Sequence, residues 1–138
     1  MNTSVHFSSA TSEWETPRAF FNEIQKTYRL DIDVCATREN TKCVRWWDKN
    51  EDGLSKDWTG IRGWMNPPYG REIGKWVEKA ATSNAEIIVA LLPARTDTRW
   101  FHSYIYKKAE IKFIKGRLKF GDGKNSAPFP SMLVIFTP

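Results

Sequence analysis

Residues 86–93 read EIIVALLP, an apolar run of strand length that ends at a proline. Because apolar side chains occupy successive positions, both faces of this strand are expected to be buried. Strands buried on both faces are typical of parallel sheets, whose strands are joined by crossovers that usually contain helices. The run therefore predicts an α/β domain, and the flanking sequence should alternate between strands and helices.

Helical spacing of apolar residues is found in three other segments. The first begins with Thr16 as N-cap and Pro17 at the first helical position. The second covers residues 71–83, and the third follows Thr96 or Asp97 as its cap. The expected inner faces of the three helices are Phe20, Phe21, Ile24 and Tyr28; Ile73, Trp76, Val77 and Ala80; and Phe101, Tyr104 and Ile105.

Further strands are expected where short apolar or β-branched runs lie between turn residues. They cover residues 30–36, 44–47, 61–65, 111–115 and 131–136. Residues 37–43 are predicted to form a helical or looped link, residues 52–58 a loop or single helical turn, and residues 116–130 a loop rich in Gly and Pro. Together these elements predict a compact three-layer α/β domain with a mostly parallel sheet and helices on both faces.

Ligands of such sheets bind beyond the carboxyl ends of the strands. Asp33, Asn66 and Pro93 lie at or just past the ends of three predicted strands, so we expect them to converge on one edge. Asp31 lies on the same side of its strand as Asp33, and for Asp31 an ion pair or a capping contact is favoured. For Asp33 such a contact and a cationic ligand both stay open, because a buried carboxylate is costly without a partner.

The length of 138 residues indicates one domain over residues 1–138, without room for a second recognition domain. The first ten residues are mostly polar and are expected to be mobile. Apolar stretches are too short for a membrane span, and the N-terminus lacks the regions of a signal peptide. A cytoplasmic protein is therefore expected.

The two cysteines, Cys35 and Cys43, form no CxxC pair, and both histidines are distant from them in the sequence. This spacing argues against a metal site. A disulfide is also disfavoured in a chain without an export signal. We therefore expect two reduced and partly buried thiols, and no metal.

The net charge of +5 is unevenly distributed. Residues 1–94 contain twelve Lys or Arg and thirteen Asp or Glu, whereas residues 95–138 contain nine basic and three acidic residues. Lys and Arg make the phosphate contacts of nucleic-acid-binding proteins. The basic last third therefore slightly favours a nucleic-acid partner over a charge that serves solubility alone.

The strand at 61–65 runs directly into Asn66-Pro67-Pro68-Tyr69. The prolines fix φ and remove two N–H donors, which leaves the Asn66 side-chain oxygen and the carbonyls of Asn66 and Pro67 as an array of acceptors. Such an array suits an exocyclic amino group with two hydrogens to donate, and Tyr69 offers a ring face for a planar base. A rigid turn at the strand end would need neither the amide nor the aromatic ring.

The chemistry of an aromatic amino group explains this combination of residues. The group is a poor nucleophile because its lone pair is delocalised into the ring. Acceptors that hold both hydrogens out of the ring plane would localise this pair and aim it at an electrophile, without a strong base. The natural electrophile is the methyl group of a sulfonium such as S-adenosylmethionine, and alignment and electrostatic stabilisation would supply most of the rate.

The chain resembles the phage-type DNA N6-adenine methyltransferases, which use S-adenosylmethionine and carry Asn-Pro-Pro-Tyr as their catalytic motif. The resemblance covers nearly the whole length. The matching blocks are SSATSEWETP at 8–17, LDIDVCATRENTKC at 30–43, DGLSKDW at 52–58, WMNPPYGREIGKWV at 64–77, LLPARTDTRWFH at 91–102 and FIKGRLKFGDGKNSAPFPSMLVIF at 113–136.

The resemblance implies a Rossmann-like methyltransferase domain that acts in the cytoplasm of a bacterial host. Its substrate would be an adenine flipped out of DNA, held by Asn66, Pro67, Pro68 and Tyr69. The implied cosubstrate residues are Trp14, Glu15, Thr16, Pro17, Asp33, Val34, Cys35, Ala36, Asp52 and Asn66. Asp33 would face the ammonium group, and Asp52 the ribose or the adenine of the cosubstrate. The implied DNA surface comprises Arg71, Arg95, Arg99, Lys115, Arg117, Lys119, Asn125 and Ser126.

The chain departs from most Rossmann-type methyltransferases, because its turn at residues 34–37 lacks the glycines of a GxGxG-like motif. The short chain also has no large target-recognition domain, so sequence specificity is weak, comes from short loops or requires a homodimer. Two other functions stay open. The acceptor could be cytosine N4 or a glutamine side-chain amide, or the chain could be a non-catalytic, methyltransferase-like DNA-binding protein.

Overall fold

The computed structural model describes residues 14–121 and 124–138; the expected mobility of residues 1–10 lies outside these ranges. In chain order the elements are α2 (Arg18–Tyr28), β1 (Ile32–Asp33), β2 (Arg45–Trp46), the 3-10 turn η1 (Gly53–Ser55), β3 (Arg62–Met65), α3 (Ile73–Thr82), β4 (Ile87–Pro93), α4 (Arg99–Tyr104), β5 (Glu110–Phe113) and β6 (Ser131–Phe136).

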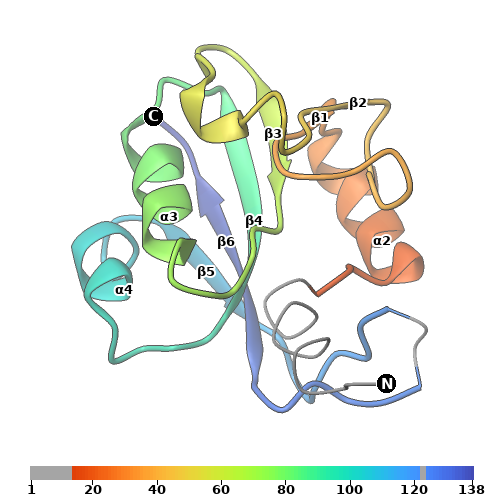
Figure 1. Ribbon diagram of the computed structural model, residues 1–138. Coiled ribbons are helices and arrows are strands. Elements are labelled where there is room, and N and C mark those ends of the chain that lie inside the picture. The colour runs from red at the N-terminus through yellow and green to blue at the C-terminus, as the bar shows by residue number, and fades with distance from the viewer. Residues whose placement is uncertain (1–13, 122–123) are drawn as a thin grey trace.

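The strands form a six-stranded sheet in the order β2-β1-β3-β4-β6-β5. β2, β1, β3 and β4 are parallel to one another, whereas β6 is antiparallel to both β4 and β5. β4 lies inside the sheet, and all of its residues are buried, as its apolar run predicts. Figure 1 shows α2 on one side of the sheet and α3 with α4 on the other. The predicted α/β domain with a mostly parallel sheet is confirmed.

The helices pack on the sheet through the apolar faces that their sequence spacing predicts. On α2, Phe21 and Ile24 are buried, and the Phe21 ring meets Trp64 of β3 edge-on at 5.1 Å between ring centroids. On α3, all four predicted core residues are buried. Helix packing therefore follows from local apolar periodicity.

Strand lengths were predicted less well. The strand expected at residues 30–36 is reduced to Ile32 and Asp33. The Asp33 carboxylate accepts a hydrogen bond from the backbone N–H of Cys35 at 3.3 Å, and this local turn interrupts the strand. The N–H groups of Val34 and Ala36 still donate to the Trp64 and Trp47 carbonyls, at 3.0 Å each. The strand expected at 44–47 likewise keeps only two residues, and the one expected at 111–115 begins and ends earlier.

Both predicted helix caps are wrong. Thr16 does not cap α2, whose N-cap position is Pro17 and has no side-chain cap. The Thr16 hydroxyl instead accepts a hydrogen bond from the Asn66 side chain. The cap of α4 is Thr98, which accepts from the N–H of Phe101, so neither Thr96 nor Asp97 serves this purpose.

The glycine-free turn at residues 34–37 is packed against a glycine from elsewhere in the chain. Gly53 of η1 approaches Val34 so closely that a Cβ on Gly53 would lie 2.2 Å from the Val34 carbonyl oxygen. The Gly53 carbonyl also accepts a hydrogen bond from the indole N–H of Trp58 at 2.8 Å. Gly53 thus provides the close backbone approach that a glycine in the turn would otherwise permit.

Replacement of Gly53 by alanine should destabilise the protein, because the methyl group must displace the backbone at Val34. We expect Gly53→Ala to lower the free energy of unfolding by about 1–3 kcal/mol, measured by chemical denaturation. Gly74→Ala is the matched control, since its added Cβ would meet nothing closer than 3.7 Å. In the first turn of α3 that change should be neutral or stabilise by less than about 1 kcal/mol. A Gly53→Ala protein as stable as the parent would contradict the role of this contact.

Candidate active site

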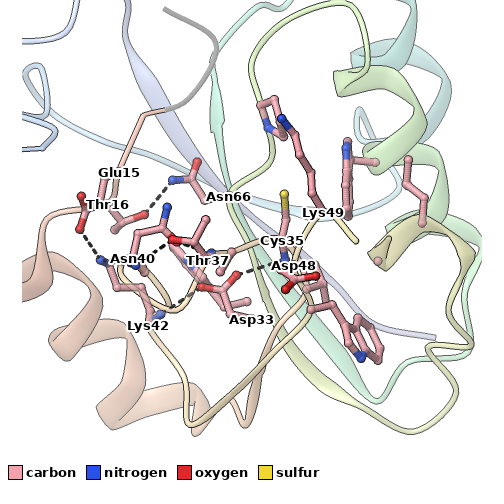
Figure 2. A pocket seen from close by; sticks show the side chains of 18 of the residues that line it. Glu15, Thr16, Asp33, Cys35, Thr37, Asn40, Lys42, Asp48, Lys49 and Asn66 are labelled. Atoms are coloured by element: carbon pink, nitrogen blue, oxygen red, sulfur yellow. Dashed lines mark hydrogen bonds and ion pairs between the residues drawn. The ribbon is translucent and has the colours of Figure 1, made fainter. Parts of the chain in front are cut away.

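A cavity of about 530 Å³ lies at the carboxyl ends of β1, β2 and β3 (Figure 2). Its volume falls within the range of roughly 300–1,000 Å³ that is usual for small-molecule sites. The lining residues are Trp14, Glu15, Thr16, Asp33, Val34, Cys35, Ala36, Thr37, Asn40, Lys42, Trp47, Asp48, Lys49, Asp52, Gly53, Leu54, Trp64, Asn66, Pro68, Glu72 and Trp76. Asp33 and Asn66 therefore converge as predicted, whereas Pro93 does not line this cavity.

The cavity walls are more acidic than basic. Five carboxylate residues, Glu15, Asp33, Asp48, Asp52 and Glu72, line it together with two lysines, Lys42 and Lys49. One of these lysines is already paired, because the Lys42 ammonium lies 3.2 Å from the Glu15 carboxylate and its side chain is almost completely buried. The remaining charge favours a ligand with positive groups.

Asp33 is buried in the wall of this cavity, with only 3% of its surface exposed. Its carboxylate accepts hydrogen bonds from the backbone N–H groups of Cys35 at 3.3 Å and Lys42 at 3.1 Å. Burial raises the pKa of Asp33 to about 7, although these hydrogen bonds and the charges of Lys42 and Arg18 act in the opposite direction. A cation bound beside Asp33 would stabilise its charged form.

Asn66 follows β3 and is held by two contacts from the segment before α2. Its Nδ2 donates to the Trp14 carbonyl and, at 3.0 Å, to the Thr16 hydroxyl (Figure 2 shows the second contact). Because the Trp14 carbonyl can only accept, these contacts fix which end of the amide is nitrogen. The other end, Oδ1, is buried and has no hydrogen-bond partner among the described residues. An unsatisfied, buried acceptor therefore belongs to a residue that lines the cavity.

Of the other motif residues, Pro67, Pro68 and Tyr69, only Pro68 lines the first cavity. Pro67 is buried. Tyr69 is also buried, with its hydroxyl donating to the Leu91 carbonyl at 2.7 Å, and burial raises the pKa of this hydroxyl well above its ordinary value. The Tyr69 ring meets Phe129 at 5.6 Å and Phe120 at 6.4 Å, both edge-on. A base that stacks on Tyr69 would therefore have to share or displace these two rings.

A second cavity of about 510 Å³ adjoins the first at Trp14 and Glu15, which line both. Its other lining residues are Phe120, Gly121, Asn125, Ser126 and Pro128. The Trp14 ring contacts Phe120 and Phe129 edge-on, at 5.5 Å and 5.1 Å. The segment that holds the Asn66 amide thus separates an acid-lined cavity from an aromatic and polar one.

Most residues implied for the cosubstrate line the first cavity, namely Trp14, Glu15, Thr16, Asp33, Val34, Cys35, Ala36, Asp52 and Asn66. Pro17 does not line it. Asp52 is exposed, and its carboxylate accepts from the N–H of Leu54 at 3.3 Å at the start of η1.

The residues implied for DNA are all exposed: Arg71, Arg95, Arg99, Lys115, Arg117, Lys119, Asn125 and Ser126. Only the last two line the second cavity. The Arg95 guanidinium also donates to the Tyr69 carbonyl at 3.4 Å, which ties this basic residue to the motif.

Several lining residues are not predicted as site residues from the sequence, among them Lys42, Trp47, Asp48 and Trp76. Asp48 could have been found, because it comes directly after a predicted strand, as does Asn66. The carboxylate of Asp48 accepts from the N–H of Glu51 at 3.0 Å, which orders the loop after β2. Lys42 and Trp76 carried no signal, since only the folded chain brings them to the cavity.

Cys35 is half-buried and Cys43 buried, and burial raises the pKa of the Cys43 thiol to about 12. Within residues 14–121 and 124–138, no cluster of three or more His, Cys, Asp or Glu is arranged to hold a metal ion. No helix in the same ranges is both long and apolar enough to cross a membrane.

Comparison with known proteins gives a consistent result. A family model described as DNA N-6-adenine-methyltransferase (Dam) matches residues 4–138. A DNA N-6-adenine-methyltransferase of Haemophilus phage HP1 (strain HP1c1) is 30% identical over 136 residues, which cover 91% of this chain and 78% of that protein. One of Escherichia phage T1 is 32% identical over 110 residues, which cover 76% of this chain and 45% of that protein. The chain therefore belongs to the DNA N-6-adenine-methyltransferase (Dam) family, as its motifs predict.

Proposed function

We propose that residues 1–138 act as one methyltransferase domain that binds S-adenosylmethionine in the acid-lined cavity and methylates N6 of an adenine flipped out of DNA. The observation that carries this proposal is the buried, unpartnered Oδ1 of Asn66, a residue that lines the cavity. Such an acceptor costs about 1–3 kcal/mol unless it is satisfied, and an amino group of a base would satisfy it. Family membership favours adenine N6 over cytosine N4 and over a protein amide.

The residues of the first cavity fit the cosubstrate in size and charge. Asp33 would hold the ammonium group, and Asp48 or Asp52 would accept from the ribose hydroxyls. Trp47 and Trp76 offer apolar walls for the adenine ring. When bound, S-adenosylmethionine supplies a methyl group on a positively charged sulfonium, and the acidic walls would stabilise that charge.

Asn66 and the prolines would prepare the acceptor nitrogen. Asn66 Oδ1 accepts one amino hydrogen, and the backbone carbonyl of Asn66 or Pro67 accepts the other. Neither proline has an N–H group to compete for these carbonyls. The amino nitrogen, with its lone pair localised, forms the bond to the methyl carbon, the bonding pair of the broken bond returns to sulfur, and the nitrogen then releases one proton to water. Alignment and electrostatics supply the rate.

The basic last third of the chain would contact the DNA. The exposed Lys115, Arg117 and Lys119 suit phosphates, while Asn125 and Ser126 line the cavity on the far side of Trp14. A flipped base would enter from this side, because the cosubstrate occupies the other. Since both similar proteins come from phages, we place the reaction in the cytoplasm of a bacterial host.

Loss of the Asn66 acceptor should abolish methylation without loss of cosubstrate binding. We expect Asn66→Ala to reduce the rate of tritiated methyl transfer to unmethylated DNA by about 100-fold or more. Nucleoside analysis of the product DNA should show N6-methyladenine in the parent. Calorimetry should show that the variant still binds S-adenosylmethionine, and Asn22→Ala, an exposed amide of α2, should behave as the parent. Equal rates of methyl transfer by the parent and by Asn66→Ala would contradict the proposal.

The raised pKa of Asp33 predicts a pH dependence of cosubstrate binding. Below about pH 7 the Asp33 carboxyl is protonated in the free protein, so a proton competes with the ammonium group. We expect the Kd for S-adenosylmethionine to fall about tenfold per unit as pH rises toward 7, and to rise again above about pH 8 as the ammonium group loses its proton. The stability of the unliganded protein should show the opposite trend. Because the pKa of Asp33 is raised from 3.8 in the unfolded chain to about 7 in the folded one, the free energy of unfolding should fall as pH rises through this range.

Calorimetric titrations from about pH 5.5 to about pH 8.5 test both trends, together with thermal unfolding of the free protein. Asp33→Asn should bind S-adenosylmethionine weakly and with little pH dependence. The stability of this variant should also lose the fall with rising pH that the Asp33 carboxyl causes in the parent. A parent Kd that does not change over this range would exclude Asp33 as the ammonium ligand.

A further inference from the structure

The Asn66 amide could in principle take two orientations, because the terminal torsion of asparagine is broad and roughly two-fold. Only one of them is useful for the proposed reaction. With Oδ1 toward the incoming base the amide accepts a hydrogen, whereas the flipped amide would point two hydrogens at the hydrogens of the amino group. Some feature of the chain must therefore select the orientation.

A carbonyl before α2 makes this selection, and a neighbouring hydroxyl, which can donate as well as accept, adds a second contact to the nitrogen. The Trp14 carbonyl and the Thr16 hydroxyl both lie within hydrogen-bond distance of Asn66 Nδ2, although they are 52 and 50 positions away in the sequence. A flipped amide would place Oδ1 against the Trp14 carbonyl, so two acceptors would face each other. The contacts thus hold the nitrogen away from the base and leave Oδ1 for it.

The Thr16 hydroxyl does not serve as a helix cap, although it comes just before α2. Thr16 is 3% exposed, and α2 begins without a side-chain cap. Its hydrogen bond in the described structure comes from Asn66. A buried hydroxyl is costly unless paired, and here the pairing serves the catalytic amide.

We propose that two groups position the Asn66 amide: the Trp14 carbonyl selects its orientation, and the Thr16 hydroxyl, which accepts from Nδ2, holds the amide in place. This inference rests on the proposed role of Asn66 as an acceptor of the adenine amino hydrogens. It gives the Trp-Glu-Thr-Pro block a function in the methyl-transfer step, beyond the lining of the cosubstrate cavity. It also explains why position 66 needs an amide, since an acceptor-only carbonyl faces it.

Substitutions at Thr16 separate positioning from cosubstrate binding. We expect Thr16→Val, which removes the hydroxyl at nearly constant volume, to lower kcat by about 10- to 100-fold while the calorimetric Kd for S-adenosylmethionine changes little. Thr16→Ser keeps the hydroxyl and should restore most of kcat. Thr82→Val is the matched control, because this hydroxyl lies on the exposed end of α3 and donates to the Glu78 carbonyl; its kcat should equal that of the parent.

A weaker Kd with unchanged kcat in Thr16→Val would overturn the inference, because Thr16 would then serve the cosubstrate alone. Failure of Thr16→Ser to restore kcat would do the same. A parent protein that transfers no methyl group would instead contradict the proposed function, so the two failures are distinguishable.

Asn66→Asp supplies a test that does not depend on the folding of the Thr16 variants. A carboxylate at this position meets the Trp14 carbonyl with no hydrogen between them, so we expect Asn66→Asp to be nearly as inactive as Asn66→Ala at neutral pH. When protonated, the carboxyl can donate to that carbonyl, so the kcat of the variant relative to the parent should rise as pH falls. The charged groups that line the same cavity are Glu15, Asp33, Lys42, Lys49, Asp48, Asp52 and Glu72.

The carboxylates among these groups outnumber the lysines and would raise the pKa of the introduced carboxyl, which brings its titration into a measurable range. Taking the ratio to the parent at each pH removes the contribution of Asp33 to both proteins. A ratio that stays constant with pH, or an Asn66→Asp protein as active as the parent at neutral pH, would overturn the inference.

Discussion

The parallel pairing of β1 with β3 is the constraint on which the site depends. Asp33 lies opposite Trp64 in the register, and the N–H of Val34 donates to the Trp64 carbonyl at 3.0 Å. Because Asn66 follows Trp64 by two residues, this register brings Asp33 and Asn66 to one edge, on strands spaced about 4.8 Å apart. A shift of one residue would turn the side chains of the shifted strand to its opposite face. The cosubstrate residue and the acceptor residue are thus positioned by a single set of backbone hydrogen bonds.

The uneven charge of the chain matches two substrates of opposite charge. Every residue that lines the acid-rich cavity falls between positions 14 and 76, within the part that carries no positive excess. The exposed basic side chains after position 95 line neither cavity. The second cavity, which shares Trp14 and Glu15 with the first, is otherwise lined by residues between 120 and 128 of the basic last third. If acidic and basic side chains were mixed in one site, the basic ones would repel the cationic cosubstrate and the acidic ones would repel the polyanionic DNA. Their separation along the chain allows both to bind, with Asn66 held where the two regions meet.

The features that the sequence predicted correctly depend on neighbours in the chain, and those that it missed depend on distant ones. The buried faces of α2 and α3 follow from apolar spacing within a few turns. A hydroxyl before a proline predicts a helix cap at Thr16, but the partner of this hydroxyl lies 50 positions away. The glycine missing from the turn after β1 is replaced by Gly53, whose contact with Val34 exists only in the folded chain. The strand-end rule identified Asp33 and Asn66, and applied consistently it would have identified Asp48.

An unpaired buried oxygen costs about 1–3 kcal/mol, a sizeable share of the 5–15 kcal/mol by which a domain is typically stable. The fold could avoid this cost if the Asn66 amide were free to turn toward a local partner. It is not free, because the Trp14 carbonyl can only accept and requires the nitrogen, which also donates to the Thr16 hydroxyl. The prolines that follow remove the N–H groups that could otherwise have reached Oδ1. The acceptor therefore stays unsatisfied until an amino group reaches it, and the free energy withheld from folding becomes available to bind and orient the base.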